Sequence, residues 1–187
     1  GASHSYTIEA HMGDGRALQA GTSHNLGQNF AEAFGVTFTE ADGSETPVHQ
    51  TSFGVSTRML GAVVMGHGDK QGLRLPPALA PTQVVIIPIP VKAKAGEDAA
   101  AAEAAATDVS AAAGRLQAAL TAGGVRCKVD SDPHQSPGWK FNHWEMKGVP
   151  VRIDIGARDL AQGHAPMSRR DGRPKGSVAL GEGAEDA

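Results

Sequence analysis

The sequence predicts an α/β protein in two parts: an α+β part with an antiparallel sheet over residues 1–80, and a three-layer α/β/α part over residues 81–175. A turn signal, Gly13-Asp14-Gly15, separates two strand-like segments, which is typical of an antiparallel hairpin. Residues 83–91 form a nearly continuous apolar run, as expected of a strand buried on both faces. An alanine-rich segment and another apolar segment follow, which gives the order strand, helix, strand of a parallel unit.

In the first part, the hairpin turn lies between strands expected over residues 5–12 and 16–20. A helix is expected next, over about residues 24–34, with Thr22 or Ser23 as its N-cap. The later elements expected here are strands at 36–39 and 48–52, a helix at 56–65, a glycine-rich loop at 66–72 and a proline-stiffened connector at 75–81. This part is too small to bury a full core, so we expect it to belong to a larger sheet.

In the second part, the apolar run precedes a helix expected from Asp98 to Ala122, which ends at Gly123-Gly124. The elements expected after it are a strand at 125–129, a helix at 141–147, a strand at 149–155, a helical turn at 158–161 and a strand end with a turn at 168–175. Residues 176–187 are small, polar and acidic, and we expect them to form a frayed tail.

Charge is distributed unevenly along the chain. The formal net charge is −3 over 187 residues, so there is no overall attraction to nucleic acid. Between Lys140 and Lys175, however, eight Lys or Arg residues stand against four Asp or Glu residues. A polyanionic partner would therefore meet this basic stretch.

Cys127 is the only cysteine, which excludes a disulfide within the chain and a zinc site built from several cysteines. No stretch is apolar and long enough for a signal peptide or a membrane span. We therefore expect a cytoplasmic protein without a membrane partner. The eight histidines show no metal-ligand spacing, and no metal site is expected.

Two polar segments about thirty residues apart, 18–30 and 50–58, place hydrogen-bonding side chains beside glycines. Gln19, Thr22 and His24 can line a small polar pocket, or Thr22 can cap a helix while His24 is exposed. Arg58, near the start of an apolar helix, can bind a phosphate through two parallel hydrogen bonds. Alternatively, its guanidinium can extend to the solvent or form a surface salt bridge. The residues alone leave both alternatives open.

A third segment, residues 137–156, combines aromatic and charged side chains. Trp139 and Phe141 can stack on splayed nucleobases, or they can belong to the core while Glu145 and Arg152 pair on the surface.

Together the three segments resemble the class II prolyl-tRNA synthetases, and the resemblance continues to about Asp171. It implies that residues 1–80 are the C-terminal part of the catalytic domain, including motif 3, that residues 81–175 are the anticodon-binding domain, and that residues 176–187 are a truncated acidic tail. The parent would be a proline–tRNA ligase, an enzyme that activates proline with ATP and Mg²⁺ and transfers it to tRNA(Pro), and it would be a homodimer. This chain alone is expected to be inactive, since half of the pocket would lie upstream.

The resemblance also implies roles for individual residues. Arg58 matches the motif 3 arginine that binds the ATP γ-phosphate and serves catalysis. The other matched positions are Gln19 and Thr22 at the adenylate, His24, Ser52 and Gly54 at the proline pocket, and Glu145 and Arg152 at the anticodon guanines. We further expect the basic stretch to face the anticodon stem-loop and to meet RNA phosphates through Lys140, Arg169, Arg170 and Lys175. Departures at Phe53, Asn25, Gly66, Ala78 and Ala157 leave these positions intact. The alternative is a non-catalytic tRNA-binding module or an inactive paralogue of the synthetase.

Overall fold

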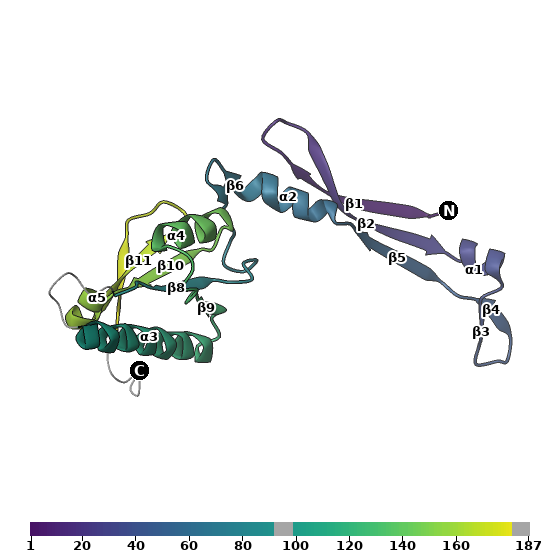
Figure 1. Ribbon diagram of the computed structural model, residues 1–187. Helices are drawn as coiled ribbons and strands as arrows, with labels where there is room; N and C mark the ends of the chain where they lie inside the picture. Colours follow the sequence, from purple (N-terminus) through teal and green to yellow (C-terminus); the bar gives the residue numbers. More distant parts are fainter. Residues whose placement is uncertain (92–98, 181–187) are drawn as a thin grey trace. The chain divides into compact units, whose positions relative to one another are not determined.

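Figure 1 shows a computed structural model of the chain, which describes residues 1–91 and 99–180. The chain divides into two compact units, Gly1–Gly66 and His67–Ala187, and each is described by itself. The division precedes the proline-rich segment that was expected to connect two domains. The expected helix start at Asp98 and tail residues 181–187 lie outside the described residues.

The first unit is built on an antiparallel sheet of three strands in the order β1-β2-β5. Its elements are β1 (His4–His11), β2 (Ala17–Gly27), α1 (Asn29–Phe34), β3 (Thr37–Thr39), β4 (Glu45–Pro47), β5 (Gln50–Val55) and α2 (Arg58–His67), the last of which ends one residue into the second unit. The predicted hairpin is confirmed, because β1 pairs with β2 and the Met12 N–H donates to the Arg16 carbonyl at 2.9 Å. Strands β3 and β4 form a separate hairpin, and β4 was not predicted.

The helix predicted from about residue 24 is wrong at its start. Strand β2 continues to Gly27, and α1 begins only at Asn29. The reason is that β2 is the central strand and pairs with β1 on one side and β5 on the other, so ladder hydrogen bonds on both edges outweigh the capping preference of Thr22 and Ser23. The strand turns at Gly27, whose φ of 57° suits glycine.

The second unit contains a mixed sheet of five strands in the order β12-β11-β10-β8-β9. Its elements are β6 (Gly68–Asp69), β7 (Gly72–Leu73), β8 (Val84–Pro88), α3 (Ala99–Ala122), β9 (Cys127–Val129), α4 (Pro137–Met146), β10 (Val151–Ile155), α5 (Ala157–Gln162), β11 (His164–Arg169) and β12 (Gly176–Ala179). Strand β8 lies parallel to β9 and to β10, which confirms the predicted strand-helix-strand unit.

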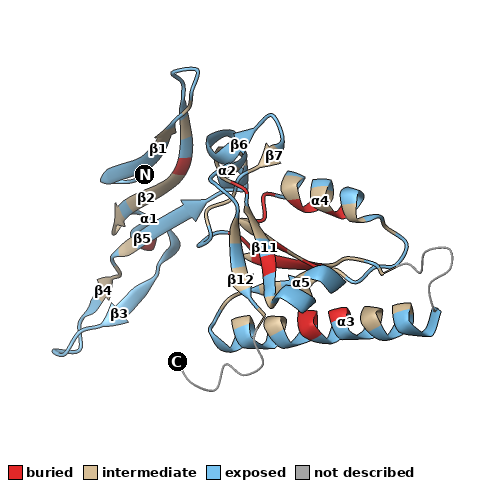
Figure 2. Cartoon of the chain, turned by 90° about the vertical axis from the view of Figure 1, so that its left-hand side faces the viewer, coloured by how far each residue is buried: buried red, intermediate tan, exposed pale blue. Residues whose placement is uncertain are grey.

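Alternate residues of β8 face the two helical layers. Val84 and Ile86 pack with Val109 of α3, whereas Val85 and Ile87 pack with Trp144 of α4. Figure 2 shows the buried residues of both helices on the sides that face the sheet. The nearly continuous apolar run therefore reflects a strand covered on both faces, and the predicted α/β class is confirmed.

The expectation of a frayed tail from residue 176 is wrong for its first residues. Gly176–Ala179 form β12, which pairs antiparallel with β11. Val178 and Leu180 pack against the hydrophobic core on the α3 side of the sheet. Their burial orders residues 176–180, although the composition of this segment is typical of a frayed tail. Residues 164–167, which the sequence analysis assigned to no element, belong to strand β11 (His164–Arg169).

Candidate nucleic-acid interface

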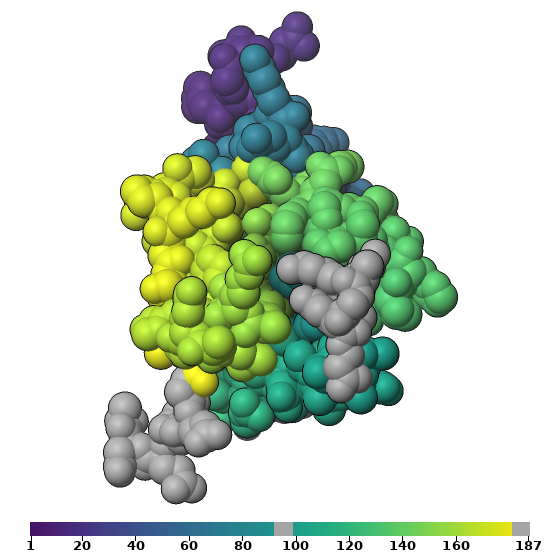
Figure 3. All heavy atoms as spheres, turned by 60° about the vertical axis from the view of Figure 1, so that its left-hand side comes forward, coloured from purple at the N-terminus to yellow at the C-terminus, as the bar shows by residue number. Residues whose placement is uncertain are grey.

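A cavity of about 220 Å³ in the second unit brings together Glu145, Arg152 and Lys175, three of the residues predicted to bind an anticodon. They come from α4, from β10 and from the turn between β11 and β12. The other residues that line the cavity are Val85, Trp144, Val149, Ser168, Arg169 and Arg170. Figure 3 shows that the surface of α4 (green) adjoins that of the last strands (yellow).

The Arg152 guanidinium is held on several sides. Its Nε donates to Asp154 Oδ1 at 2.9 Å, and its Nη2 lies 3.5 Å from Ser168 Oγ. Its central carbon lies 4.0 Å from the centre of the Phe141 ring, a cation–π contact. Among residues 1–91 and 99–180, Nη1 has no hydrogen-bond partner. A preorganised guanidinium therefore keeps donor capacity for a ligand in the cavity.

Asp154 and Ser168 were missed by the sequence analysis, although Arg152 and Asp154 stand two residues apart on one face of β10. Burial raises the pKa of the Asp154 carboxyl, against the lowering effect of Arg152 and Lys175. The carboxylate therefore depends on the Arg152 charge for its stability, as the guanidinium depends on Asp154 for its orientation.

Glu145 and Lys175 are less constrained. The Glu145 carboxylate is half-buried and takes part in no hydrogen bond or ion pair within the described parts of the chain. A carboxylate of this kind can accept from the N–H groups of a base edge. Lys175 is exposed and acts on Asp154 only through its charge. Trp139 is 46% exposed and stacks on His143 with ring centres 4.6 Å apart.

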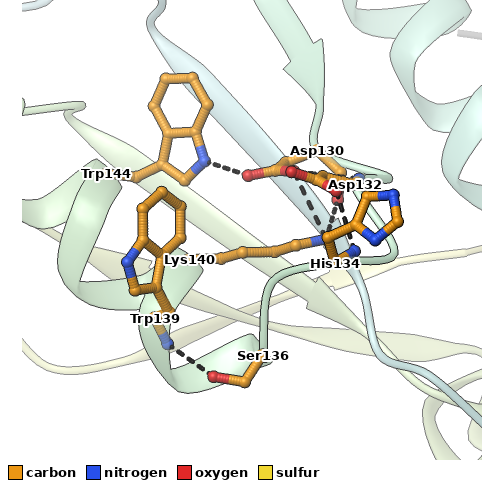
Figure 4. A network of polar contacts seen from close by, with 7 residues as sticks. All are labelled: Asp130, Asp132, His134, Ser136, Trp139, Lys140 and Trp144. Carbon is orange, nitrogen blue, oxygen red and sulfur yellow. Dashed lines mark hydrogen bonds and ion pairs between the residues drawn. The ribbon is translucent and has the colours of Figure 1, made fainter.

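Lys140 is not presented to a partner as the sequence analysis expected. Only 4% of its side chain is exposed, and its Nζ donates to the Asp130 carbonyl at 2.8 Å and lies 3.4 Å from Asp130 Oδ1. Figure 4 shows the same carboxylate accepting from Trp144 Nε1, at 2.7 Å. Burial would raise the pKa of Asp130, but these hydrogen bonds and the Lys140 charge hold it below its usual value. Lys140 thus joins α4 to the end of β9.

The two neighbouring arginines also differ from the expectation of phosphate contacts. Arg170 is 8% exposed, and its guanidinium forms a two-point ion pair with Asp69. Arg169 is exposed but pairs with Asp171, and this contact lowers the pKa of that carboxyl to about 2. Of the four predicted phosphate contacts, only Lys175 has an ammonium or guanidinium group without an ion pair in the described residues.

In the first unit, the three residues predicted to bind the adenylate form a chain of hydrogen bonds. Arg58 Nη1 lies 3.4 Å from Gln19 Oε1, and Gln19 Nε2 donates to Thr22 Oγ1 at 2.9 Å. Residues three apart on a strand ordinarily face opposite sides, but the pairing with β1 skips Ala20, so that β2 bulges there. The bulge turns Gln19 to the side of Thr22.

The three residues predicted for a proline pocket lie on adjacent strands. His24 of β2 is opposite Ser52 of β5, and Thr22 is opposite Gly54. Because Thr22 and His24 are two residues apart, these pairs belong to one face of the sheet. His24 Nδ1 lies 2.7 Å from Ser5 Oγ, which fixes the imidazole. The geometry thus groups the two predicted sets, adenylate and proline, within one unit.

Comparison with known proteins tests the family resemblance. Residues 83–185 match the family described as "Anticodon binding domain", which covers more than half of the chain. The chain belongs to this family. The cavity with Glu145, Arg152 and Lys175 lies inside the matched range.

The relatives agree with the predicted resemblance, which is thereby confirmed. "Proline--tRNA ligase, chloroplastic/mitochondrial" of Arabidopsis thaliana is 50% identical over 181 residues, 97% of this chain and 32% of that protein. "Proline--tRNA ligase" of Mycobacterium leprae (strain TN) is 52% identical over 181 residues, 96% of this chain and 35% of that protein. The enzyme of the same name from Porphyromonas gingivalis is 50% identical over 186 residues, 100% of this chain and 36% of that protein. The chain thus spans about a third of the length of these curated relatives.

Two further findings concern the described residues. Within residues 1–91 and 99–180, no three side chains of His, Cys, Asp or Glu gather closely enough to hold a metal ion. No helix in the same ranges combines the length and apolar character that crossing a bilayer requires.

Proposed function

We propose that this chain provides anticodon recognition and part of the aminoacylation site of a proline–tRNA ligase. The observation that carries the proposal is the cavity in which Glu145, Arg152 and Lys175 meet, inside the range that matches the anticodon-binding family. Relatives about 50% identical over nearly the whole chain supply the identity of the amino acid.

Base reading follows from the donor and acceptor pattern of guanine. Glu145 offers carboxylate oxygens to the Watson–Crick N–H groups, and Arg152 offers N–H groups to O6 and N7. Asp154 and Phe141 hold the Arg152 guanidinium in advance, so little rotamer freedom is lost on binding. Lys175, exposed at the edge of the cavity, meets a phosphate. Lys140 orders α4 rather than touching RNA.

Activation of proline requires no protein nucleophile. The proline carboxylate attacks the α-phosphate of ATP, pyrophosphate leaves, and catalysis consists of positioning and charge stabilisation. Arg58 binds the γ-phosphate, Gln19 and Thr22 contact the adenylate, and His24, Ser52 and Gly54 line the proline pocket. The Arg58–Gln19–Thr22 chain supports this grouping. None of these residues carries a carboxylate, so we assign no ligand of the ATP-bound Mg²⁺ to this chain.

The remaining parts of the proposal come from the family resemblance. The whole ligase would be a homodimer in the cytoplasm, with tRNA(Pro), proline and ATP as partners. Residues 1–80 would belong to its catalytic domain, and the anticodon-binding domain would begin at residue 81. Similarity to bacterial ligases supports this location.

A binding experiment tests the anticodon function. We expect the chain to bind proline tRNA more tightly than the same tRNA with its anticodon guanines replaced by adenines, by about 1–3 kcal/mol per guanine. Lys175→Ala should weaken binding to both RNAs alike and reduce the salt slope by about one unit. Equal affinity of the wild-type chain for both RNAs would contradict base reading.

A second candidate function is a non-catalytic RNA-binding module. One observation favours it: the family match, residues 83–185, includes none of the residues proposed for aminoacylation. We expect this chain alone to show no proline-dependent ATP–pyrophosphate exchange. In the whole ligase, Arg58→Ala should cost about 2–4 kcal/mol of transition-state stabilisation. Unchanged kinetics in that variant would remove Arg58 from the site.

A further inference from the structure

Arg170 is a buried arginine whose donors are shared between two separate segments. Its Nη1 donates to Asp69 Oδ2 at 2.8 Å and its Nη2 to Asp69 Oδ1 at 2.6 Å. Its Nε donates to the backbone carbonyl of Glu145 at 3.0 Å. A two-point guanidinium–carboxylate contact fixes direction as well as distance. Arg170 thereby links the Glu145 backbone to Asp69, which lies 101 positions before Arg170 in the sequence.

Asp69 is itself fixed in place. It lies at the turn of the β6–β7 hairpin, where its Oδ1 accepts from the Gln71 N–H at 2.8 Å. The hairpin packs closely on the segment after α4: a Cβ added at Gly72 would lie 2.6 Å from the Met146 carbonyl oxygen, and one added at Gly148 would lie 2.6 Å from Leu73 Cβ. The Arg170 contact lowers the pKa of Asp69 to about 2, so the carboxylate is charged at neutral pH.

The bond to Glu145 lies at the C-terminal end of α4, where carbonyl groups lack partners within the helix and carry partial negative charge. The Glu145 carbonyl also accepts from the Gly148 N–H at 3.0 Å, so the guanidinium adds a second, charge-assisted hydrogen bond and complements the helix dipole. Arg170 also follows, by two residues, Ser168, which contacts Arg152. The same short segment therefore contacts both residues proposed to read guanine, one through its backbone and one through its side chain.

We propose that Asp69 and Arg170 are positioning residues for base reading: the pair holds the Glu145 end of α4 at a set distance from Arg152 and so determines discrimination between anticodons. This inference rests on the proposed function. Neither residue contacts the base. Because both oxygens of Asp69 and three nitrogens of Arg170 are engaged within the protein, the pair acts through Glu145.

The test compares three variants of the chain: Asp69→Asn, Arg170→Lys and, as matched control, Asp171→Asn. Asp171 is also an arginine-paired aspartate in the same segment, but its partners are Arg169 and Arg173. The measured quantity is the discrimination ratio: the dissociation constant for an anticodon stem-loop RNA with adenines in place of its guanines, divided by that for the same RNA with its guanines. Loss of folded protein weakens both complexes by one factor and leaves the ratio unchanged, so the ratio separates positioning from stability.

Asp69→Asn and Arg170→Lys should each lower the ratio by at least about fivefold, since a misplaced carboxylate loses part of its base contact. Their affinity for the adenine RNA, corrected for folded fraction, should stay unchanged. Asp171→Asn should keep the wild-type ratio. A wild-type ratio retained in Asp69→Asn and Arg170→Lys would overturn this inference while leaving the proposed function intact. A wild-type chain without discrimination would overturn both.

Discussion

Replacing Lys140 with methionine should destabilise the second unit strongly. Methionine keeps the length of the side chain, so the change removes a charge with little change in packing. Asp130 would then keep a half-buried carboxylate without its ammonium partner. Breaking a buried pair costs about 3–5 kcal/mol, and we expect the lower end, about 3 kcal/mol, because Asp130 still accepts from Trp144 Nε1.

Urea unfolding followed by tryptophan fluorescence measures this, since Trp139 and Trp144 both lie on α4. Lys147→Met is the matched control: Lys147 caps the opposite, C-terminal end of α4, is exposed, and lies over the Trp144 ring at 5.1 Å, so its loss should change the free energy of unfolding by about 1 kcal/mol or less. Suppose instead that Lys140→Met unfolds like the wild type and flattens the salt dependence of RNA binding. Lys140 would then face RNA, and the assignment of a structural role would be refuted.

Amide hydrogen exchange should show stronger protection in residues 84–155 than in 18–65, and the reverse order would contradict the proposed domain boundary. The pKa of Asp69 falls to about 2 on folding, from about 3.9 in unfolded chains. Its contribution to the free energy of unfolding should therefore be present above about pH 4 and be lost as the pH falls toward 2. Urea unfolding at several pH values should show that Asp69→Asn loses less stability over this range than the wild type. Gly148→Ala should lower the free energy of unfolding by about 3 kcal/mol, because φ is +75° and the added Cβ would clash with Leu73. Gly172→Ala, where φ is +73° but the surrounding space is open, should lower it by about 1 kcal/mol. Equal losses of stability in a urea titration would show that the close contact with Leu73 is unimportant.

The second unit could largely be predicted from sequence because its signals are local and mutually consistent. The apolar run at 83–91 and the alanine-rich helix after it specify a buried strand and its crossover. The first unit was less predictable. The start of α1 was misplaced because pairing of β2 on both edges overrides local capping signals, and no local pattern near Thr22 reports such pairing.

The residues of the candidate site could be identified only from the resemblance to the synthetase family. The hydrogen bonds and ion pairs that orient them became visible only in the structure. Glu145, Arg152 and Lys175 were expected together and line one cavity. Lys140 was placed wrongly because a lysine in a basic stretch is usually exposed; its spacing of four from Trp144, on one helix face, was the available signal of burial. The Asp69–Arg170 pair spans 101 positions, and no sequence periodicity links such residues.

The central claim is that Arg152 reads an anticodon guanine, and a double-mutant cycle tests it most directly. The four affinities are those of the wild type and Arg152→Ala for the guanine RNA and for the RNA with adenine at the read position. We predict a coupling energy of about 1–3 kcal/mol, with none for Arg158→Ala, an exposed arginine of α5 that lies outside the cavity. A coupling energy near zero for Arg152, with both RNAs weakened equally, would contradict the account.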